Sequence, residues 1–398
     1  MKILGDSQIL LFDELFSSLG ETATYSGREL SEGQLIGVDA LITRSTLNVD
    51  QALLANTDVK FVGTCTIGID HLDTAFLDQQ NITWANAPAC NANAVVQYVL
   101  SAMAQLAPQW MSATVGIIGC GNVGGRVYRR LTALGVNCKV YDPILSALLP
   151  VDLSIGLSGQ NNPDLVSLEE LLQSDIITSH APLTTTGDFP SYHLLGEKEL
   201  EQLRPNTLLI SAGRGAVINN QALIKRLTDK KDIRVALDVW ENEPNISAEL
   251  LSLVDIATPH IAGHSLEGKE QGTVMVFEQL CQHLDVAPPV RVMDVVNTET
   301  SALPSLSNSR LSNTPDSTPE DILNQVLLSA YPIMQDDARL RAWNQSDQTM
   351  ATYFDRMRKN YPIRREYSHF IFPEVAQLSP VFDWLNVLGS RMSLKNIR

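Results

Sequence analysis

A chain of 398 residues exceeds the usual size of one domain, so we expect two or three domains. Its composition, 44% hydrophobic and 19% charged, is that of a globular protein and excludes disordered, collagen-like and disulfide-scaffold classes. The formal net charge of −16 repels phosphate backbones and anionic membranes, so neither nucleic acid nor a membrane is an expected partner. An anionic substrate would need a local basic pocket.

The first ninety residues alternate short apolar runs with helical patterns, which predicts a small α/β unit with a parallel sheet. A helix is predicted over 93–106, and Pro108 ends it. A second α/β series follows, and its six predicted strands suit a doubly wound, Rossmann-type sheet. These strands are 114–118, 137–141, 176–179, 208–211, 235–239 and 256–258.

A further helix is predicted near 269–284, and the composition of 286–289 and 301–319 is typical of linkers. A third domain is expected after them, with helical runs such as 321–330. It also carries a basic cluster: Arg356, Arg358, Lys359, Arg364 and Arg365. The predicted domains are 1–93 with 260–285, 94–259, and 286–398.

The cysteines are scattered without C-x-x-C spacing, so neither a zinc site nor a disulfide framework is suggested, and no metal is expected. They are Cys65, Cys90, Cys120, Cys138 and Cys281. Asp6 interrupts what would be the apolar part of a signal peptide, and no apolar run reaches membrane-spanning length. These features favour a cytoplasmic protein.

A G-x-G-x-x-G motif, formed by Gly119, Gly121 and Gly124, follows the predicted strand 114–118 and opens a helical run. Such glycines allow a tight turn, a close approach of the backbone to a pyrophosphate and close helix–strand packing. The next strand ends at Asp142, where a carboxylate can bind an adenosine ribose. Because no Arg is adjacent, the motif favours NAD over NADP. The alternative is a glycine-rich turn without a cofactor.

Three further predicted strands end next to an Arg, a carboxylate and a His: Arg214, Glu243 and His260. Arg214 could hold a carboxylate with its planar fork, while Glu243 orients His260. His260 could then take a hydroxyl proton as hydride leaves for a nicotinamide. Each residue alone is ordinary, and a surface Arg, a solvated acid and a structural His are the alternatives.

These segments resemble the D-2-hydroxyacid dehydrogenase family over nearly the whole chain. The general pattern lies in the glycine motif, 211–215, 238–244 and 259–263. Residues 64–73, 86–95, 264–269 and the C-terminal extension resemble the branch that oxidises 4-phospho-D-erythronate in pyridoxal 5′-phosphate (vitamin B6) biosynthesis. The resemblance implies a Rossmann-type NAD domain inserted in a flavodoxin-like lid domain. It also implies a C-terminal α+β domain that forms a homodimer.

The resemblance further implies catalytic roles for Arg214, Glu243 and His260. It implies substrate contacts by Ser45, Thr66 and His264. Residues implied or expected to bind NAD are Gly119, Gly121, Asn122, Val123, Gly124, Asp142, Ala212, Gly213, Asp238 and Gly263. His264 and Ala181 stand where tyrosine and threonine are common, which predicts altered affinity rather than altered chemistry.

Two other functions stay open at this point. The substrate could be another D-2-hydroxyacid such as 3-phosphoglycerate. Alternatively, the chain could be an NAD-sensing binding protein that kept the fold, although the presence of Arg214, Glu243 and His260 favours an enzyme. The basic cluster of the third domain could bind a substrate phosphate or simply face water.

Overall fold

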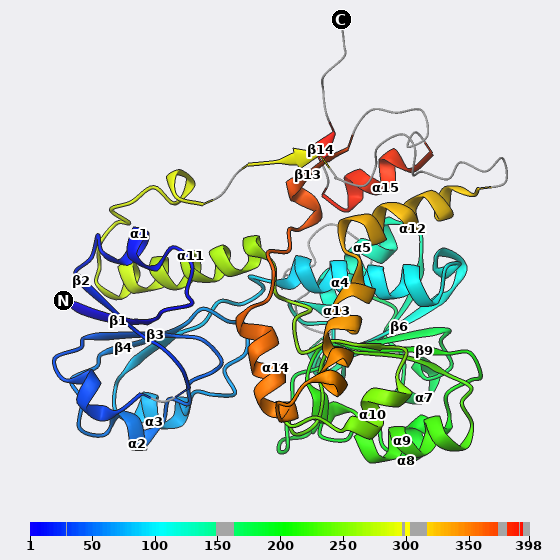
Figure 1. Ribbon diagram of the computed structural model, residues 1–398, viewed down its shortest axis with the longest axis horizontal. Coiled ribbons are helices and arrows are strands. Elements are labelled where there is room, and N and C mark those ends of the chain that lie inside the picture. Colours follow the sequence, from blue (N-terminus) through cyan, green and yellow to red (C-terminus); the bar gives the residue numbers. More distant parts are fainter. Residues whose placement is uncertain are drawn as a thin grey trace, which may run out of the picture. The chain divides into compact units, whose positions relative to one another are not determined.

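The computed structural model describes residues 1–28, 30–148, 163–296, 299–302, 317–372, 380–389 and 391–392 (Figure 1). The chain divides into two compact units. The first comprises Met1–Ala92 and His264–Glu299, and the second comprises Asn93–Gly263 and Thr300–Arg398. Most of the predicted linker 301–319 lies outside the described residues. No helix in the described ranges is long and apolar enough to cross a bilayer.

The first unit is built on a five-stranded parallel sheet of order β2-β1-β3-β4-β5. Its strands are β1 Lys2–Asp6, β2 Glu21–Tyr25, β3 Ala40–Thr43, β4 Phe61–Thr64 and β5 Thr83–Ala85. The strand order is that of flavodoxin-like folds, as predicted. Its helices are α1 Phe12–Phe16, α2 Gln51–Leu54, α3 Thr74–Gln79 and α11 Leu266–His283.

Apolar residues alternate along these strands and contribute to two separate cores, one on each face of the sheet. Ile42 and Phe61 pack with α1 and α11 on one face of the sheet, while Leu41 and Val62 pack with α2 and α3 on the other. Helix α11 lies so close to β4 that a Cβ on Gly63 would meet the Val276 side chain at 2.3 Å. Both faces are therefore covered, as a parallel sheet requires.

The second unit contains a six-stranded parallel sheet of order β11-β10-β9-β8-β6-β7. Its strands are β6 Thr114–Ile118, β7 Asn137–Tyr141, β8 Ile176–Ser179, β9 Leu208–Ser211, β10 Arg234–Leu237 and β11 Ile256–Ala257. The order reverses beside β6, the strand that leads into the glycine motif. This doubly wound sheet confirms the predicted fold class and creates the crevice in which such sheets bind ligands.

Helices cover both faces of this sheet (Figure 1). The inserted segment contributes α4 Ala92–Leu106, α5 Gly124–Ala133, α6 Pro143–Leu148, α7 Leu168–Leu171, α8 Glu197–Glu201, α9 Asn220–Asp229 and α10 Ala248–Leu253. The C-terminal extension contributes α12 Pro319–Ala330, α13 Ile333–Arg341, α14 Met350–Lys359 and α15 Phe382–Val387. The extension also forms a small sheet from β12 Ser301–Ala302, β13 Phe370–Phe372 and β14 Arg391–Met392.

The described part of the extension packs into the cores of the Rossmann-type sheet. Leu323 and Val326 of α12 share one buried cluster with Val99 of α4 and Val127 of α5. Helix α13 packs on β11, and Phe354 of α14 belongs to the core on the opposite face of the sheet. The extension therefore buries apolar surface against the strands and helices that carry the candidate site.

Candidate active site

The glycine motif forms a tight turn between β6 and α5. Gly119 has φ +80°, and a Cβ there would lie 2.8 Å from the Ala181 backbone. A Cβ on Gly124 would lie 1.8 Å from the carbonyl oxygen of Gly119, so only glycine lets the helix begin so close to the strand. Around Gly121, by contrast, nothing lies within 4 Å of such a Cβ. This bare backbone next to a helix N-terminus fits a dinucleotide pyrophosphate.

Asp142 follows β7 and binds the same turn. One carboxylate oxygen accepts from the Cys120 amide at 2.8 Å, and the other accepts from the Leu145 amide at 2.9 Å. The side chain is partly exposed. These contacts hold the carboxylate at the strand end where a ribose hydroxyl could donate to it.

Arg214 lies on the loop after β9, and close packing fixes the path of that loop. A Cβ on Gly213 would lie 3.0 Å from the Ala181 carbonyl oxygen, and one on Gly215 would lie 2.0 Å from the Trp240 carbonyl group. The loops after β8, β9 and β10 thus touch backbone to backbone on both sides of Arg214. The structure therefore gives these glycines a steric role that sequence reasoning did not assign.

Glu243 and His260 form a hydrogen-bonded pair at the ends of β10 and β11. His260 Nδ1 lies 2.7 Å from Glu243 Oε2, and the other carboxylate oxygen accepts from the Trp240 amide at 2.8 Å. His260 has φ +55°, a left-handed conformation that is uncommon for residues other than glycine. Its amide donates to the Asp238 carbonyl at 2.7 Å. Backbone groups of the segment that follows β10 thus hold both members of the pair.

The charges around Glu243 keep it ionised. Burial alone would raise the pKa of its carboxyl group, but the neighbouring His260 charge and hydrogen bond, the Trp240 amide and the Arg358 charge together lower it. An ionised Glu243 accepts a hydrogen bond from the Nδ1–H group of His260, which leaves Nε2 as the basic nitrogen of the ring. The pair can therefore act as a general base with an orienting carboxylate.

Asp238, an expected NAD contact, is 1% exposed and binds the protein itself. Its carboxylate accepts from the Thr258 hydroxyl at 2.6 Å and from the Ile261 and Ala262 amides at 2.8 Å each. Burial raises the pKa of this carboxyl group, although His260 and these donors lower it. The structure thus shows Asp238 organising the His260 loop, and its NAD contact stays a prediction.

His180 directly follows β8 (Ile176–Ser179) next to the glycine turn, and sequence reasoning noted only its neighbour Ala181. Its Nε2 pairs with the Thr178 hydroxyl at 2.9 Å, and burial lowers the pKa of the ring to about 4. The imidazole is therefore neutral at physiological pH. The backbone of Ala181 lies directly against Gly119, since a Cβ on Gly119 would lie 2.8 Å from the Ala181 amide nitrogen.

The expected substrate residues Ser45, Thr66 and His264 lie in the first unit. Ser45 follows β3 and is exposed, and Asp50 rather than Ser45 caps α2 by accepting from the Leu53 amide. Thr66 follows β4, and its hydroxyl lies 2.8 Å from that of Thr64. His264 opens the segment that leads into α11. Ser45 and Thr66 thus share the carboxyl edge of one parallel sheet.

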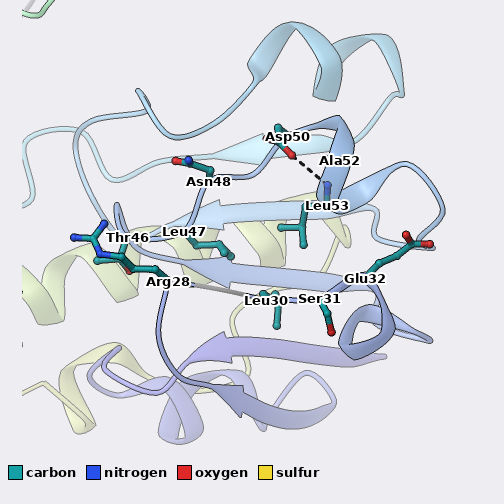
Figure 2. Close-up of a pocket in the computed structure, with 10 residues that line it drawn as sticks. All are labelled: Arg28, Leu30, Ser31, Glu32, Thr46, Leu47, Asn48, Asp50, Ala52 and Leu53. Atoms are coloured by element: carbon teal, nitrogen blue, oxygen red, sulfur yellow. Dashed lines mark hydrogen bonds between the residues drawn. The ribbon is translucent and has the colours of Figure 1, made fainter.

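A hollow of about 500 Å³ opens beside this edge, next to Thr46 (Figure 2). Figure 2 shows Arg28 on one side of it, with Asp50 and Glu32 also among the side chains that line it. One cation against two carboxylates does not favour a phosphate dianion. We therefore assign no substrate group to this hollow.

The basic cluster of the extension separates into different environments. Arg364 is buried, with its guanidinium bound to backbone carbonyls, so the structure contradicts a phosphate contact by this residue. Arg356 is exposed and lies over the Tyr353 ring. Arg358 lies near enough to Glu243 to lower the pKa of that carboxyl group. In the sequence these residues formed one run of positive charges. Only the packing shows that they lie in different environments.

Comparisons with known proteins show the family of the chain. The family model for the NAD binding domain of D-isomer specific 2-hydroxyacid dehydrogenases matches residues 92–262, and a domain of unknown function matches 302–389. The chain is 46% identical to an erythronate-4-phosphate dehydrogenase of Cellvibrio japonicus, covering 98% of this chain and 100% of the relative. It is 44% identical to one of Teredinibacter turnerae, covering 93% and 94%.

Solved structures share the fold at lower identity. An NAD-bound 3-phosphoglycerate dehydrogenase of Entamoeba histolytica matches with a TM-score of 0.60 at 21% identity, covering 72% of this chain and 95% of that one. A D-lactate dehydrogenase of Aquifex aeolicus matches with a TM-score of 0.59 at 20% identity, covering 72% and 96%. At such identities the likeness concerns the fold alone.

The NAD-binding model and the glycine turn that fits a pyrophosphate make NAD the cofactor of this chain, and the protein is an NAD-dependent oxidoreductase. The full-length relatives reported above are both named erythronate-4-phosphate dehydrogenase. The doubly wound sheet and the glycine turn are those expected of an NAD-binding domain. The chain therefore belongs to the D-isomer specific 2-hydroxyacid dehydrogenase family, in its erythronate-4-phosphate dehydrogenase branch.

Proposed function

We propose that the protein oxidises 4-phospho-D-erythronate at C2 to (R)-3-hydroxy-2-oxo-4-phosphooxybutanoate, in pyridoxal 5′-phosphate biosynthesis. The Glu243–His260 pair, which lies at the same sheet edge as the dinucleotide turn, is the observation that carries the reaction class. The names of the full-length relatives support the choice of substrate.

In this reaction His260 Nε2 takes the proton of the C2 hydroxyl. Its Nδ1 is bound to ionised Glu243, which stabilises the imidazolium as it forms. NAD, when bound, accepts the hydride from C2. Protonated His260 then releases its proton to solvent, and the neutral base is restored.

Arg214 binds the substrate carboxylate and polarises the oxygen at C2. A guanidinium suits this role because its two parallel N–H donors match a carboxylate. We propose Ser45, Thr66 and His264 as further substrate contacts. The NAD contacts proposed are Gly119, Gly121, Asn122, Val123, Gly124, Asp142, Ala212, Gly213, Asp238 and Gly263.

A substrate panel tests this function. Purified protein with NAD is mixed with D-2-hydroxyacids with and without a terminal phosphate, including 4-phospho-D-erythronate and 3-phosphoglycerate, and NADH absorbance is followed. The highest kcat/KM is expected for 4-phospho-D-erythronate. A higher value for 3-phosphoglycerate would reassign the substrate, and NAD binding without turnover of any acid would favour a sensing protein.

We also propose that the protein is a cytoplasmic homodimer that assembles through the C-terminal domain. The resemblance of the extension to dimerisation domains supports the dimer, and the five cysteines, none of which forms a disulfide, suit a reducing compartment. Because α12 shares a core with α4 and α5, deleting the extension would expose apolar surface. The test is therefore light scattering of the full chain, and the mass of one chain would exclude the dimer.

A further inference from the structure

Arg364 joins the C-terminal extension to the loop that carries His260. It follows α14, its side chain is 7% exposed, and its guanidinium donates to the Ile261 carbonyl at 3.3 Å and to the Ala262 carbonyl. It also donates to the Ala94 carbonyl in α4 at 3.2 Å. A buried arginine that binds three backbone carbonyls fixes backbone positions and is shielded from small anions in solution.

Asp238 holds the same two residues from the opposite side of the backbone. It accepts from the amides of Ile261 and Ala262, while Arg364 donates to their carbonyls. All four hydrogen-bonding groups of these two residues are thus bound to buried charged side chains. The preceding residue, His260, has the left-handed φ of +55°. Such a conformation persists only where its surroundings determine it strongly.

The extension in turn holds Arg364 in place. The guanidinium lies 4.4 Å from the centre of the Tyr331 ring, a cation–π distance. The hydroxyls of Tyr331 and Tyr361 both donate to Asp336, at 2.8 and 2.6 Å. These side chains come from segments 331–336 and 361–364, so the arrangement belongs to the extension.

We propose that Arg364 is a positioning residue for His260, through which the C-terminal extension sets the orientation of the catalytic imidazole. The proposal rests on the proposed function in one respect, that His260 is the base. Proton transfer requires the imidazole nitrogen within hydrogen-bond reach of the hydroxyl, and a displacement of about 1 Å can cost about a hundredfold in rate. Arg364 touches neither reacting atoms nor the proposed Arg214 site in this arrangement, so its effect passes through the His260 backbone.

The test compares three variants of the full chain. Arg364→Met removes the charge and the donors, and Arg364→Lys keeps the charge but loses the planar fork. Arg204→Met is the control, because Arg204 also donates to a carbonyl, that of Gln173, and to the Asp175 carboxylate, but at an exposed position. For each, kcat, KM, the Kd for NAD and the urea unfolding curve are measured.

We expect Arg364→Met to lower kcat about tenfold to a hundredfold while KM and the Kd for NAD change less than about twofold. Arg364→Lys should recover part of kcat, and Arg204→Met should match the parent protein. The NMR signals of the His260 ring, assigned with His260→Gln, should shift in Arg364→Met, because the bond to Glu243 loosens. This spectrum needs no turnover.

Two results would overturn the proposal. One is a folded Arg364→Met or Arg364→Lys protein with parental kcat and unchanged NMR signals of the His260 ring. The other is a fall of kcat that follows the folded fraction in both variants, which would make Arg364 a stabilising residue only. If the parent protein oxidises no hydroxyacid, the proposed function fails, whereas the NMR signals of the His260 ring still decide whether Arg364 positions His260.

Discussion

Two histidine–glutamate pairs are held by one loop of the second unit, through Glu241 and Glu243. They differ in whether the second nitrogen of the histidine ring is also bound within the protein. His193 pairs with Glu241 through Nε2 at 2.5 Å, and His260 pairs with Glu243 through Nδ1 at 2.7 Å. Both histidines have left-handed backbones, with φ +52° and +55°. Neither the residue types nor the strained backbone distinguishes the pairs.

The difference lies in the second ring nitrogen. His193 Nδ1 accepts from the Asn219 side chain at 3.1 Å, so both nitrogens of that ring are bound within the protein. For His260 Nε2 the structure records no protein hydrogen-bond partner in the described part of the chain. Glu241 is also bound on its other oxygen by the Asn220 amide at 2.8 Å. The His193 pair is a closed cross-link, whereas in the His260 pair only Nδ1 is bound by the described part of the chain, as the proposed role of Nε2 requires.

The largest expected effect is that of His260→Ala. Loss of the proton acceptor should lower kcat about 10² to 10⁴-fold, the usual contribution of general base catalysis. The Kd for NAD should stay near the parental value, because the glycine turn is untouched. Steady-state kinetics and NAD titration check this. Near-normal turnover would remove His260 from its proposed role and end the distinction between the pairs.

Glu243→Gln is expected to have the next largest effect. A neutral amide cannot stabilise the imidazolium, so kcat should fall about tenfold or more, and the acid limb of kcat/KM should move to lower pH because protonated His260 loses its anionic partner. Glu241→Gln is the matched control and should leave the limb in place. The measurement is a pH profile of kcat/KM for both variants. Equal profiles would contradict the comparison.

Glu243→Gln should also change how the free energy of unfolding depends on pH. The lowered pKa of Glu243 means that its ionisation stabilises the folded state fully above the ordinary glutamate pKa, about 4.3. This contribution is lost as the pH falls through the lowered native pKa. Glu243→Gln lacks it, so the stability deficit of this variant relative to the parent protein should shrink in that acidic range. Urea unfolding at several pH values measures the difference, and parallel curves would contradict it.

Gly215→Ala should disturb both pairs at once. The new methyl group would lie 2.0 Å from the Trp240 carbonyl group, so the loop that carries both glutamates must shift. We expect a loss of about 1–3 kcal/mol in unfolding free energy, as for overpacked sites, together with a several-fold lower kcat. Gly33→Ala is the control, because a Cβ there meets only the Ser31 hydroxyl at 4.0 Å. Equal stability of the two variants would show that the loop adapts freely.

His193→Ala is expected to have the smallest effect on catalysis. Removing a closed cross-link should cost about 1–3 kcal/mol of stability because Glu241 and Asn219 lose a partner, while kcat for the folded protein stays within about threefold. Thermal unfolding and kinetics with saturating substrate check this. A loss of kcat comparable to that of His260→Ala would mean that His193 also serves the reaction.

Local signals in the sequence determined the strands, the glycine turn and much of the site. Five-residue apolar runs ending in turn residues placed β6 and β7 at their predicted bounds, because periodicity and turn chemistry depend on near neighbours. The strand predicted over 235–239 instead spans Arg234–Leu237, since Asp238 turns away to bind the His260 loop. Arg214, Glu243 and His260 were predicted as site residues because each follows a predicted strand.

Tertiary structure alone decided what the basic cluster and the second histidine pair do. Arg364 looked like its charged neighbours, yet it binds carbonyls 103 and 270 residues away in the chain. The second ring nitrogen of His193 is bound because Asn219, the N-cap of α9, reaches it. Such roles depend on which distant groups meet in the folded chain, and a buried polar group acquires its function from those partners.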